Sequence, residues 1–185
     1  MACSGTIEGR GETEELQVTD SPLLIVLTGL PYCGKTTLGR GLEGVGADVV
    51  ELDRINRARG FRIEDGVPVA EWGETIRRAE VRIAESSAEV VVLSWVNPTE
   101  RDRQRWRDFA GARGIRCQVV YLAADQELLD ARRGAAVAGP DRHVLSDEVL
   151  QRVQRRFQPP PEGSAVVLEA SWSVEKQLEV VTAAV

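Results

Sequence analysis

The residues with the clearest chemical meaning lie in the stretch GLPYCGKT, at positions 29 to 36. Gly29 and Gly34 bracket four residues, and Lys35 and Thr36 follow directly, which matches the pattern G-x-x-x-x-G-K-[ST]. Glycines let a backbone wrap around an anion with its N–H groups pointing inward, and the N-terminus of a following helix adds positive potential. We therefore expect this loop to bind the terminal phosphates of a nucleoside triphosphate.

Each position of this loop has an expected role. Lys35 reaches the outer phosphates as a point charge, and the hydroxyl of Thr36 binds Mg²⁺. The main chain of the loop, with Pro31 and Cys33 inside it, surrounds the phosphates. The pattern thus predicts ATP and Mg²⁺ as cofactors.

Phosphoryl transfer also needs a carboxylate, arginines and a cover that excludes water. Asp53 follows an apolar run, so we expect it at the carboxyl edge of a sheet as catalytic base and Mg²⁺ ligand. The alternative for Asp53 is a cap on a helix beginning at Arg54. Residues 132 to 146, approximately, are predicted to form a lid, because arginines flank the glycine-containing segment 134–145.

Three arginines are candidates for that lid. Arg132 is the one we expect to act in catalysis, and Arg133 and Arg142 are expected to contact the nucleotide. Four further arginines alternate along residues 101 to 107, and we interpret them as a solvated helix face.

Alternating apolar and helical segments must position these residues. Short apolar runs predict strands at 23–29, 47–53, 89–95, 115–124 and 165–170. Helical patterns separate them at 35–46, 71–87, 98–114, 125–133 and 146–157, and a last one follows at 173–185. This alternation predicts an α/β fold of three layers, with a five-stranded parallel sheet between helices.

Composition limits the other possibilities. The chain has 185 residues with 43% hydrophobic content, which suits one domain at 21–185 preceded by a polar, flexible tail at 1–20. The net charge of −6 disfavours broad binding to nucleic acid or to an anionic membrane. Three widely spaced cysteines fit neither a disulfide framework nor a zinc site. We predict a cytoplasmic protein without a membrane partner.

Several segments together resemble the small P-loop kinases related to polynucleotide kinase, chloramphenicol phosphotransferase and the zeta toxins. The matching stretches are GLPYCGKTT, ELD ending at Asp53, EW at 71–72, VVVLSWVN, RDRQRWRDFA, VVYLAADQELLDARR and RHVLSDEVLQRVQRRFQPP. The resemblance covers about residues 23–170. It implies nucleotide contacts that include Thr37, a base at Asp53 and lid arginines. The chain departs from the family pattern at Ser94, where related proteins often have an aspartate that supports Mg²⁺.

Three functions remain open from the sequence. The first is an ATP-dependent kinase that phosphorylates a hydroxyl of a small molecule. The second is a 5′-hydroxyl nucleic-acid kinase, which the acidic composition disfavours. The third is a nucleotide-binding regulatory module with little transfer activity, which Ser94 favours.

Overall fold

The computed structural model describes residues 22–137 and 144–185. Its strands are β1 (Leu23–Thr28), β2 (Asp48–Glu51), β3 (Val90–Ser94), β4 (Arg116–Ala123) and β5 (Val166–Glu169). Its α-helices are α1 (Lys35–Gly44), α2 (Leu52–Ala58), α3 (Trp72–Glu85), α4 (Glu100–Gly111), α5 (Gln126–Val137), α6 (Asp147–Arg156) and α7 (Val174–Ala184). Short 3₁₀ turns follow α2 at Ile63–Asp65 and precede α3 at Val69–Glu71.

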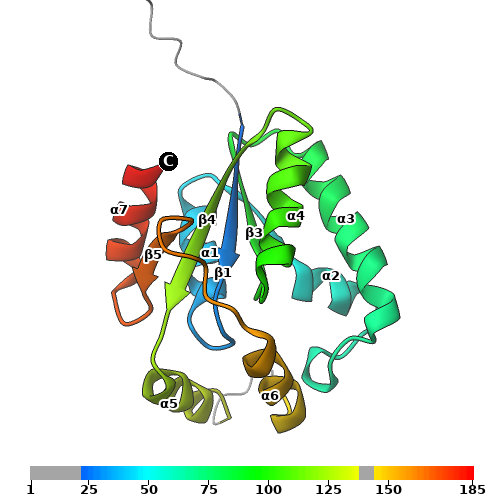
Figure 1. Cartoon of the computed structure of the whole chain (residues 1–185), viewed down its shortest axis with the longest axis vertical. Coiled ribbons are helices and arrows are strands. Elements are labelled where there is room, and N and C mark those ends of the chain that lie inside the picture. Colours follow the sequence, from blue (N-terminus) through cyan, green and yellow to red (C-terminus); the bar gives the residue numbers. More distant parts are fainter. Residues whose placement is uncertain (1–21, 138–143) are drawn as a thin grey trace, which may run out of the picture.

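The five strands form one parallel sheet in the order β2-β3-β1-β4-β5 (Figure 1). The central strand β1 is apolar and buried along its whole length, as expected for a strand covered on both faces. Its residue Leu27 lies opposite Ser94 of β3 and Val120 of β4. Because all strands run in one direction, the loops that follow β1, β2 and β3 meet at the same edge.

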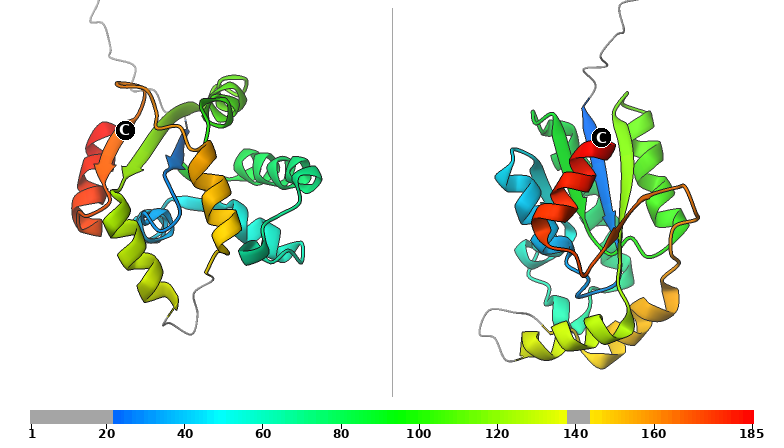
Figure 2. Two further views of the ribbon diagram at one scale, coloured as in Figure 1. Left: turned by 60° about the horizontal axis from the view of Figure 1, so that its bottom comes forward. Right: turned by 90° about the vertical axis from the view of Figure 1, so that its left-hand side faces the viewer.

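Two apolar clusters fill the space on either side of the sheet. Ile25 of β1 packs with Leu38 of α1 on the face that α1 and α7 cover. The next residue, Val26, packs with Trp106 of α4 on the face that α3 and α4 cover. Figure 2 shows α5 and α6 beyond the carboxyl end of the strands, where they border the site described below.

The three-layer α/β fold and its five parallel strands confirm the prediction from the sequence. Several boundaries differ by a few residues, and two of these differences concern the expected site. The second strand ends at Glu51, so Asp53 belongs to the first turn of α2. Helix α5 continues through Gly134 to Val137, so residues 134–137 of the expected mobile segment are helical.

The predicted tail at 1–20, Arg142 and part of the expected lid lie outside the described residues. In the ranges that are described, no helix combines the length and the apolar character needed to cross a membrane.

Candidate active site

The phosphate-binding loop connects β1 to α1. Gly29 and Gly34 have φ values of 146° and 110°, which side-chain-bearing residues rarely adopt. A Cβ added at Gly29 would lie 2.7 Å from the Sγ of Cys33 and 2.8 Å from the carbonyl oxygen of Leu122, so only glycine fits there. The loop is therefore held close against β4 and opens in the other direction.

Lys35 lies inside this loop. Its Nζ donates hydrogen bonds to the carbonyl oxygens of Gly29 (2.9 Å) and Leu30 (2.8 Å). The ammonium group thus occupies the mouth of the loop, in a position to exchange these carbonyls for phosphate oxygens.

A cavity of about 590 Å³ opens in front of the loop. All the loop and helix residues predicted to bind the nucleotide between Pro31 and Thr37 line it, and Thr36 and Thr37 are exposed. The side chain of Cys33 is fully buried in the core, so only its backbone faces a nucleotide. Gly29 lies behind the loop and contacts Leu122 instead.

The predicted lid arginines have different surroundings. Arg132 of α5 lines the cavity and donates to the carbonyl oxygens of Cys33 (2.8 Å) and Ala170 (2.6 Å), which brings α5, the loop and the end of β5 together. Arg133 is not among the residues that line the cavity, because its guanidinium forms an ion pair with Asp147 of α6.

The loop after β5 and the first turn of α7 supply a part of this cavity that the sequence analysis missed. Ala170, Trp172, Val174 and Gln177 line it on the side of Arg132. This wall offers apolar and aromatic surface suited to a nucleotide base. Its position at the carboxyl end of a parallel strand was the available signal, since ligands of such sheets bind at that edge.

Asp53 lies where α2 begins, directly after β2. Burial raises the pKa of its carboxyl group above the ordinary value, and the positive charges of Arg57 and Lys35 oppose that rise. Asp53 and Lys35 line the same cavity.

A network of polar side chains fastens α2 to α3. Arg59, which follows α2, forms an ion pair with Glu71 and donates a hydrogen bond to the Oγ1 of Thr75 at 2.5 Å. The same hydroxyl donates to the Oδ1 of Asn56, also at 2.5 Å. Because Asn56 and Thr75 are buried, this network fixes the helix that presents Asp53.

The oxygen atoms beside the loop fit a magnesium ion delivered with a nucleotide. Thr36, Asp53 and Ser94 line the same cavity, and Ser94 lies opposite Glu51 in the sheet. Within the described residues there is no cluster of three or more His, Cys, Asp or Glu that could hold a metal by itself. Mg²⁺ commonly takes only one or two protein ligands and completes its shell with phosphates and water, and this sparse set is compatible with that coordination.

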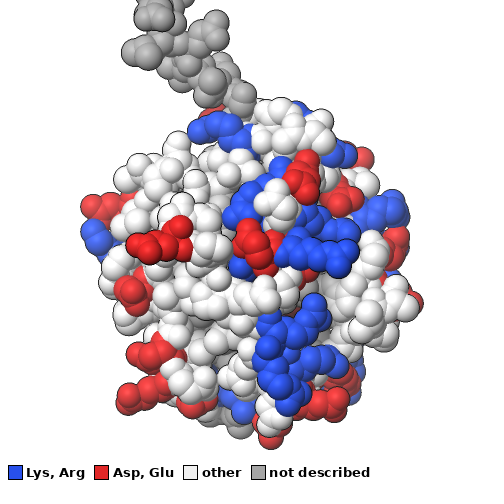
Figure 3. Space-filling model, viewed as in Figure 1, with Lys and Arg blue, Asp and Glu red and all other residues white. Residues whose placement is uncertain are grey.

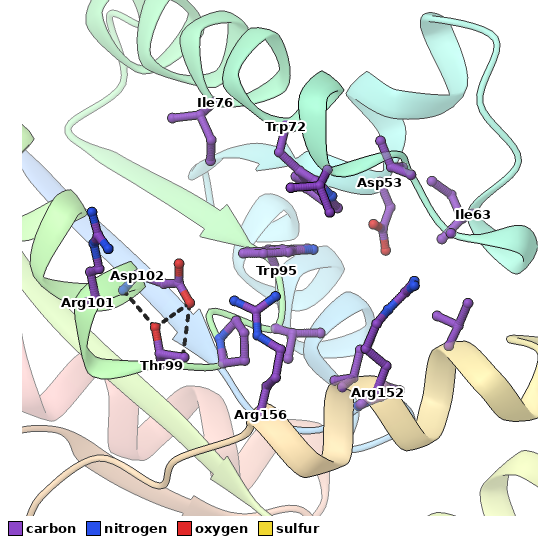
Figure 4. Close-up of a pocket in the computed structure, with 18 of the residues that line it drawn as sticks. Asp53, Ile63, Trp72, Ile76, Trp95, Thr99, Arg101, Asp102, Arg152 and Arg156 are labelled. Carbon is purple, nitrogen blue, oxygen red and sulfur yellow. Dashed lines mark hydrogen bonds between the residues drawn. The ribbon is translucent and has the colours of Figure 1, made fainter.

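A second cavity of about 680 Å³ adjoins the first. Asp53, Trp95 and Val96 line both cavities. Figure 4 shows Asp53 and Arg152 pointing into this second space, with Trp72 and Trp95 along its wall. The indole rings of Trp72 and Trp95 lie 4.6 Å apart between centroids. This aromatic wall was not anticipated as part of a site.

The segment after β3 is tied to β1. The Oγ1 of Thr28 donates to the carbonyl oxygen of Val96 (2.9 Å), and the Nδ2 of Asn97 donates to the carbonyl oxygen of Leu27 (2.7 Å). The Oδ1 of Asn97 also accepts the indole N–H of Trp106 at 3.1 Å. These bonds place Trp95 and Val96 directly beside the phosphate-binding loop.

The expected solvated face of α4 needs one correction. Arg103 is fully buried, because its Nη1 donates to the carbonyl oxygen of Asn97 (3.1 Å) and its Nε donates to Glu100 (3.0 Å). Arg101 and Arg105 are exposed and line the rim of the second cavity.

Comparison with known proteins places these features in a wider group. A family model described as an AAA domain matches residues 24–160. A gluconokinase from Sinorhizobium meliloti 1021 has a similar structure, with a TM-score of 0.64 and 19% identity over 88% of this chain and 90% of that one. No curated protein sequence is significantly similar to this chain.

Two further solved structures share the fold and were determined with nucleotides. The APS kinase CysC of Mycobacterium tuberculosis, in complex with AMPPNP and APS, has a TM-score of 0.61 and 19% identity over 88% of this chain and 96% of that one. Kti12 of Chaetomium thermophilum, in complex with ADP-AlF3, has a TM-score of 0.67 and 15% identity over 87% of this chain and 96% of that one. At these identities the likeness concerns the fold alone.

Proposed function

Because this chain belongs to the AAA domain family and its phosphate-binding loop opens beside a second cavity, we propose that it is an ATP-dependent phosphotransferase. It transfers the γ-phosphoryl group of ATP to a hydroxyl of a small molecule. Gluconokinase and APS kinase, which share the fold, are kinases by name, and this supports the proposal.

The observation that carries this proposal is the place of Asp53. It lines both the cavity in front of the phosphate-binding loop and the neighbouring one. A carboxylate at the junction can accept a proton from an acceptor hydroxyl while that oxygen faces the γ-phosphate. Catalysis of phosphoryl transfer consists mostly of such positioning and of charge stabilisation.

The proposed step uses three side chains. The acceptor oxygen forms a bond to the γ-phosphorus, the bond from that phosphorus to the bridging oxygen of ADP breaks, and Asp53 takes the hydroxyl proton. Lys35 leaves the carbonyl oxygens of Gly29 and Leu30 to bind the outer phosphates. Arg132 stands beside the loop, where it stabilises phosphate charge.

Thr36 and Asp53 are the residues that would hold Mg²⁺, which when bound neutralises phosphate charge in the transition state. Ser94, which lines the same cavity, would offer this ion a hydroxyl rather than a carboxylate, and its contact would therefore be weaker than that of an aspartate.

A transfer assay tests the function. The protein is incubated with γ-labelled ATP, Mg²⁺ and a panel of metabolites and antibiotics, and mass spectrometry detects an acceptor that has gained one phosphate. Lys35→Ala should abolish ATP binding or turnover, whereas Asp53→Asn should spare binding and stop transfer. Equal transfer by wild type and Asp53→Asn would remove Asp53 as the base.

A nucleotide-binding regulatory module is the second candidate. Ser94 at the end of β3 favours it, because an aspartate there would support the metal more strongly. Calorimetric binding of ATP without transfer to any panel member would favour this module. A protein that shows no calorimetric response to ATP or GTP at millimolar concentrations would contradict both candidates.

A further inference from the structure

We propose that the acceptor is an organic anion with a flat ring, bound with its ring on Trp95 and its negative group on the arginines of α6. This inference rests on the phosphotransferase function proposed above, because it names the substrate class of the same site.

The second cavity has the size and position of an acceptor site. Its volume of about 680 Å³ falls within the roughly 300–1,000 Å³ typical of small-molecule pockets. Residues of α3, α4 and α6 surround it, and Asp53 connects it to the nucleotide cavity. A molecule bound here can present a hydroxyl to Asp53.

The wall of this cavity is mostly apolar and aromatic. It includes Ile63, Val67, Ile76, Val149 and Val153. Trp72 and Trp95 contact each other at a tilt of 41°, so Trp72 already covers one side of Trp95. Figure 4 shows Trp95 lying between Trp72 and Arg156, so a flat ring would enter on the face toward Arg156, beside the guanidinium group. Offset stacking on an indole favours unsaturated rings over puckered ones.

The charge of the rim is positive. Of the described residues that line the cavity, Arg101, Arg105, Arg152 and Arg156 are basic and Asp53 and Asp102 are acidic, and Arg105 also lies 4.0 Å from Glu80. The carboxylate of Asp102 is already engaged by Thr99 in the cap of α4. Figure 3 shows the basic side chains gathered on this face over α4 and over α6.

Two of these arginines are available to a ligand. Among the residues that the structure describes, Arg152 and Arg156 make no hydrogen bond or ion pair with another side chain or with the backbone. A guanidinium group presents a planar fork of donors that matches a carboxylate, sulfate or phosphate. An anionic group on the acceptor would accept hydrogen bonds from both guanidinium groups.

A small molecule fits these observations better than a nucleic acid does. The net charge of −6 disfavours an extended polyanion, and the aromatic wall lies in a cavity bordered by α3, α4 and α6. A 5′-hydroxyl oligonucleotide is therefore the competing ligand in the test.

The test measures binding to wild-type protein saturated with AMPPNP, so that the nucleotide cavity is filled. The probes are para-hydroxymethylbenzoate, which is flat and anionic, para-benzenedimethanol, which is flat and neutral, and gluconate, which is anionic and not flat. Uridine 5′-monophosphate and uridine form a larger charged and neutral pair. Calorimetry and tryptophan fluorescence report the affinities, and the flat anion of at least one pair should bind about tenfold tighter than its neutral partner and than gluconate.

Three variants locate the binding. Arg152→Gln and Arg156→Gln should each weaken the flat anion about tenfold and leave the neutral partner unchanged. Trp95→Leu should weaken both flat molecules by about three- to tenfold. The matched control is Arg155→Gln, which changes an exposed residue of α6 that does not line the cavity and should leave all affinities unchanged.

Several results would overturn the inference. They are equal affinity for charged and neutral partners, equal affinity for gluconate, binding of no probe, or tighter binding of a salt-sensitive 5′-hydroxyl oligonucleotide. Failure of the function itself is recognised separately, because in that case AMPPNP does not bind in the first titration, or γ-labelled ATP binds without transfer to any member of the assay panel.

Discussion

The phenol oxygen of Tyr32 accepts a hydrogen bond from the backbone N–H of Leu145 at 3.0 Å. Tyr32 belongs to the phosphate-binding loop and has a left-handed φ of 69°. Leu145 directly precedes Ser146, the cap of α6. One hydrogen bond therefore joins the loop that faces the nucleotide to the helix that presents Arg152 and Arg156.

Tyr32→Phe should weaken acceptor binding more than ATP binding. The change removes the oxygen that positions the start of α6 and keeps the ring in place, at a cost of about 1 kcal/mol. Steady-state kinetics should show an acceptor KM about fivefold higher, with the ATP KM changed less. Tyr121→Phe is the control, because it removes a phenol oxygen from β4 and keeps the ring that packs against Phe157. An unchanged acceptor KM would mean that this bond does not position α6.

Asp53→Asn should raise stability at pH 7 while it stops transfer. The pKa of Asp53 is raised in the folded protein, chiefly by burial, so folding favours its protonated form. The stability that this group contributes is present below its unfolded pKa and is lost as the pH rises through its folded pKa. Thermal unfolding should therefore show a higher Tm for Asp53→Asn at pH 7.

The same comparison has an internal check. The difference in Tm should shrink as the pH falls toward 4, near the ordinary pKa of an aspartate. Asp65→Asn, at an exposed position, should show no such pH-dependent increase in Tm over wild type. A Tm of Asp53→Asn below that of wild type at pH 7 would show that the ionised carboxylate stabilises the fold.

The rate of transfer should fall on the acid side with the ionisation of Asp53. Because the base must be deprotonated and its pKa is raised, the acid limb of kcat/KM should lie above the pKa of an ordinary aspartate. Arg57 lowers this pKa, so Arg57→Gln should move the limb to higher pH. A limb that does not move in Arg57→Gln would indicate that another group titrates.

Ser94→Asp should strengthen the dependence on Mg²⁺. Ser94 ends β3 and lines the nucleotide cavity, so a carboxylate there would reach the ion or its water. Half-maximal stabilisation of the ATP complex in a thermal shift assay should need about tenfold less Mg²⁺. Ser94→Asn adds similar volume without charge and should leave the required Mg²⁺ concentration unchanged. If both variants lose ATP binding equally, the position tolerates no larger side chain.

Asn97→Ala should destabilise the fold by about 2–4 kcal/mol. Asn97 is fully buried, and its loss would leave the carbonyl oxygen of Leu27 and the indole N–H of Trp106 without their partners. Urea unfolding measures this change. Gln104→Ala, on the exposed side of α4, should cost less than about 0.5 kcal/mol. Equal midpoints for these two variants would contradict the structural role of Asn97.

Local signals were sufficient to predict the fold and the phosphate-binding loop. Continuous apolar runs marked the strands, and the spacing of Gly29, Gly34 and Lys35 marked the loop between β1 and α1. The lid residues, the cofactors, the acceptor and the specific kinase group remain predictions, as does the role of each site residue.

Features that depend on tertiary placement were not predictable. The burial of Arg103 requires the carbonyl oxygen of Asn97, whose backbone has an unusual φ of 43°. The second cavity requires α3, α4 and α6 to meet around Trp95, and no local pattern encodes the positions of three helices relative to one another. The start of α2 at Leu52 reflects helical packing that overrides an apolar run typical of a strand.

The hydrogen bonds between the segment after β3 and the end of β1 have a practical meaning for engineering. They hold Val96, which both cavities share, to Thr28 in the central strand, so the junction between the cavities is fixed to the sheet. Helix α6, by contrast, borders the second cavity without belonging to the sheet. Redesign of α6 alone could thus retarget this scaffold to new alcohols without rebuilding the machinery that handles the phosphate.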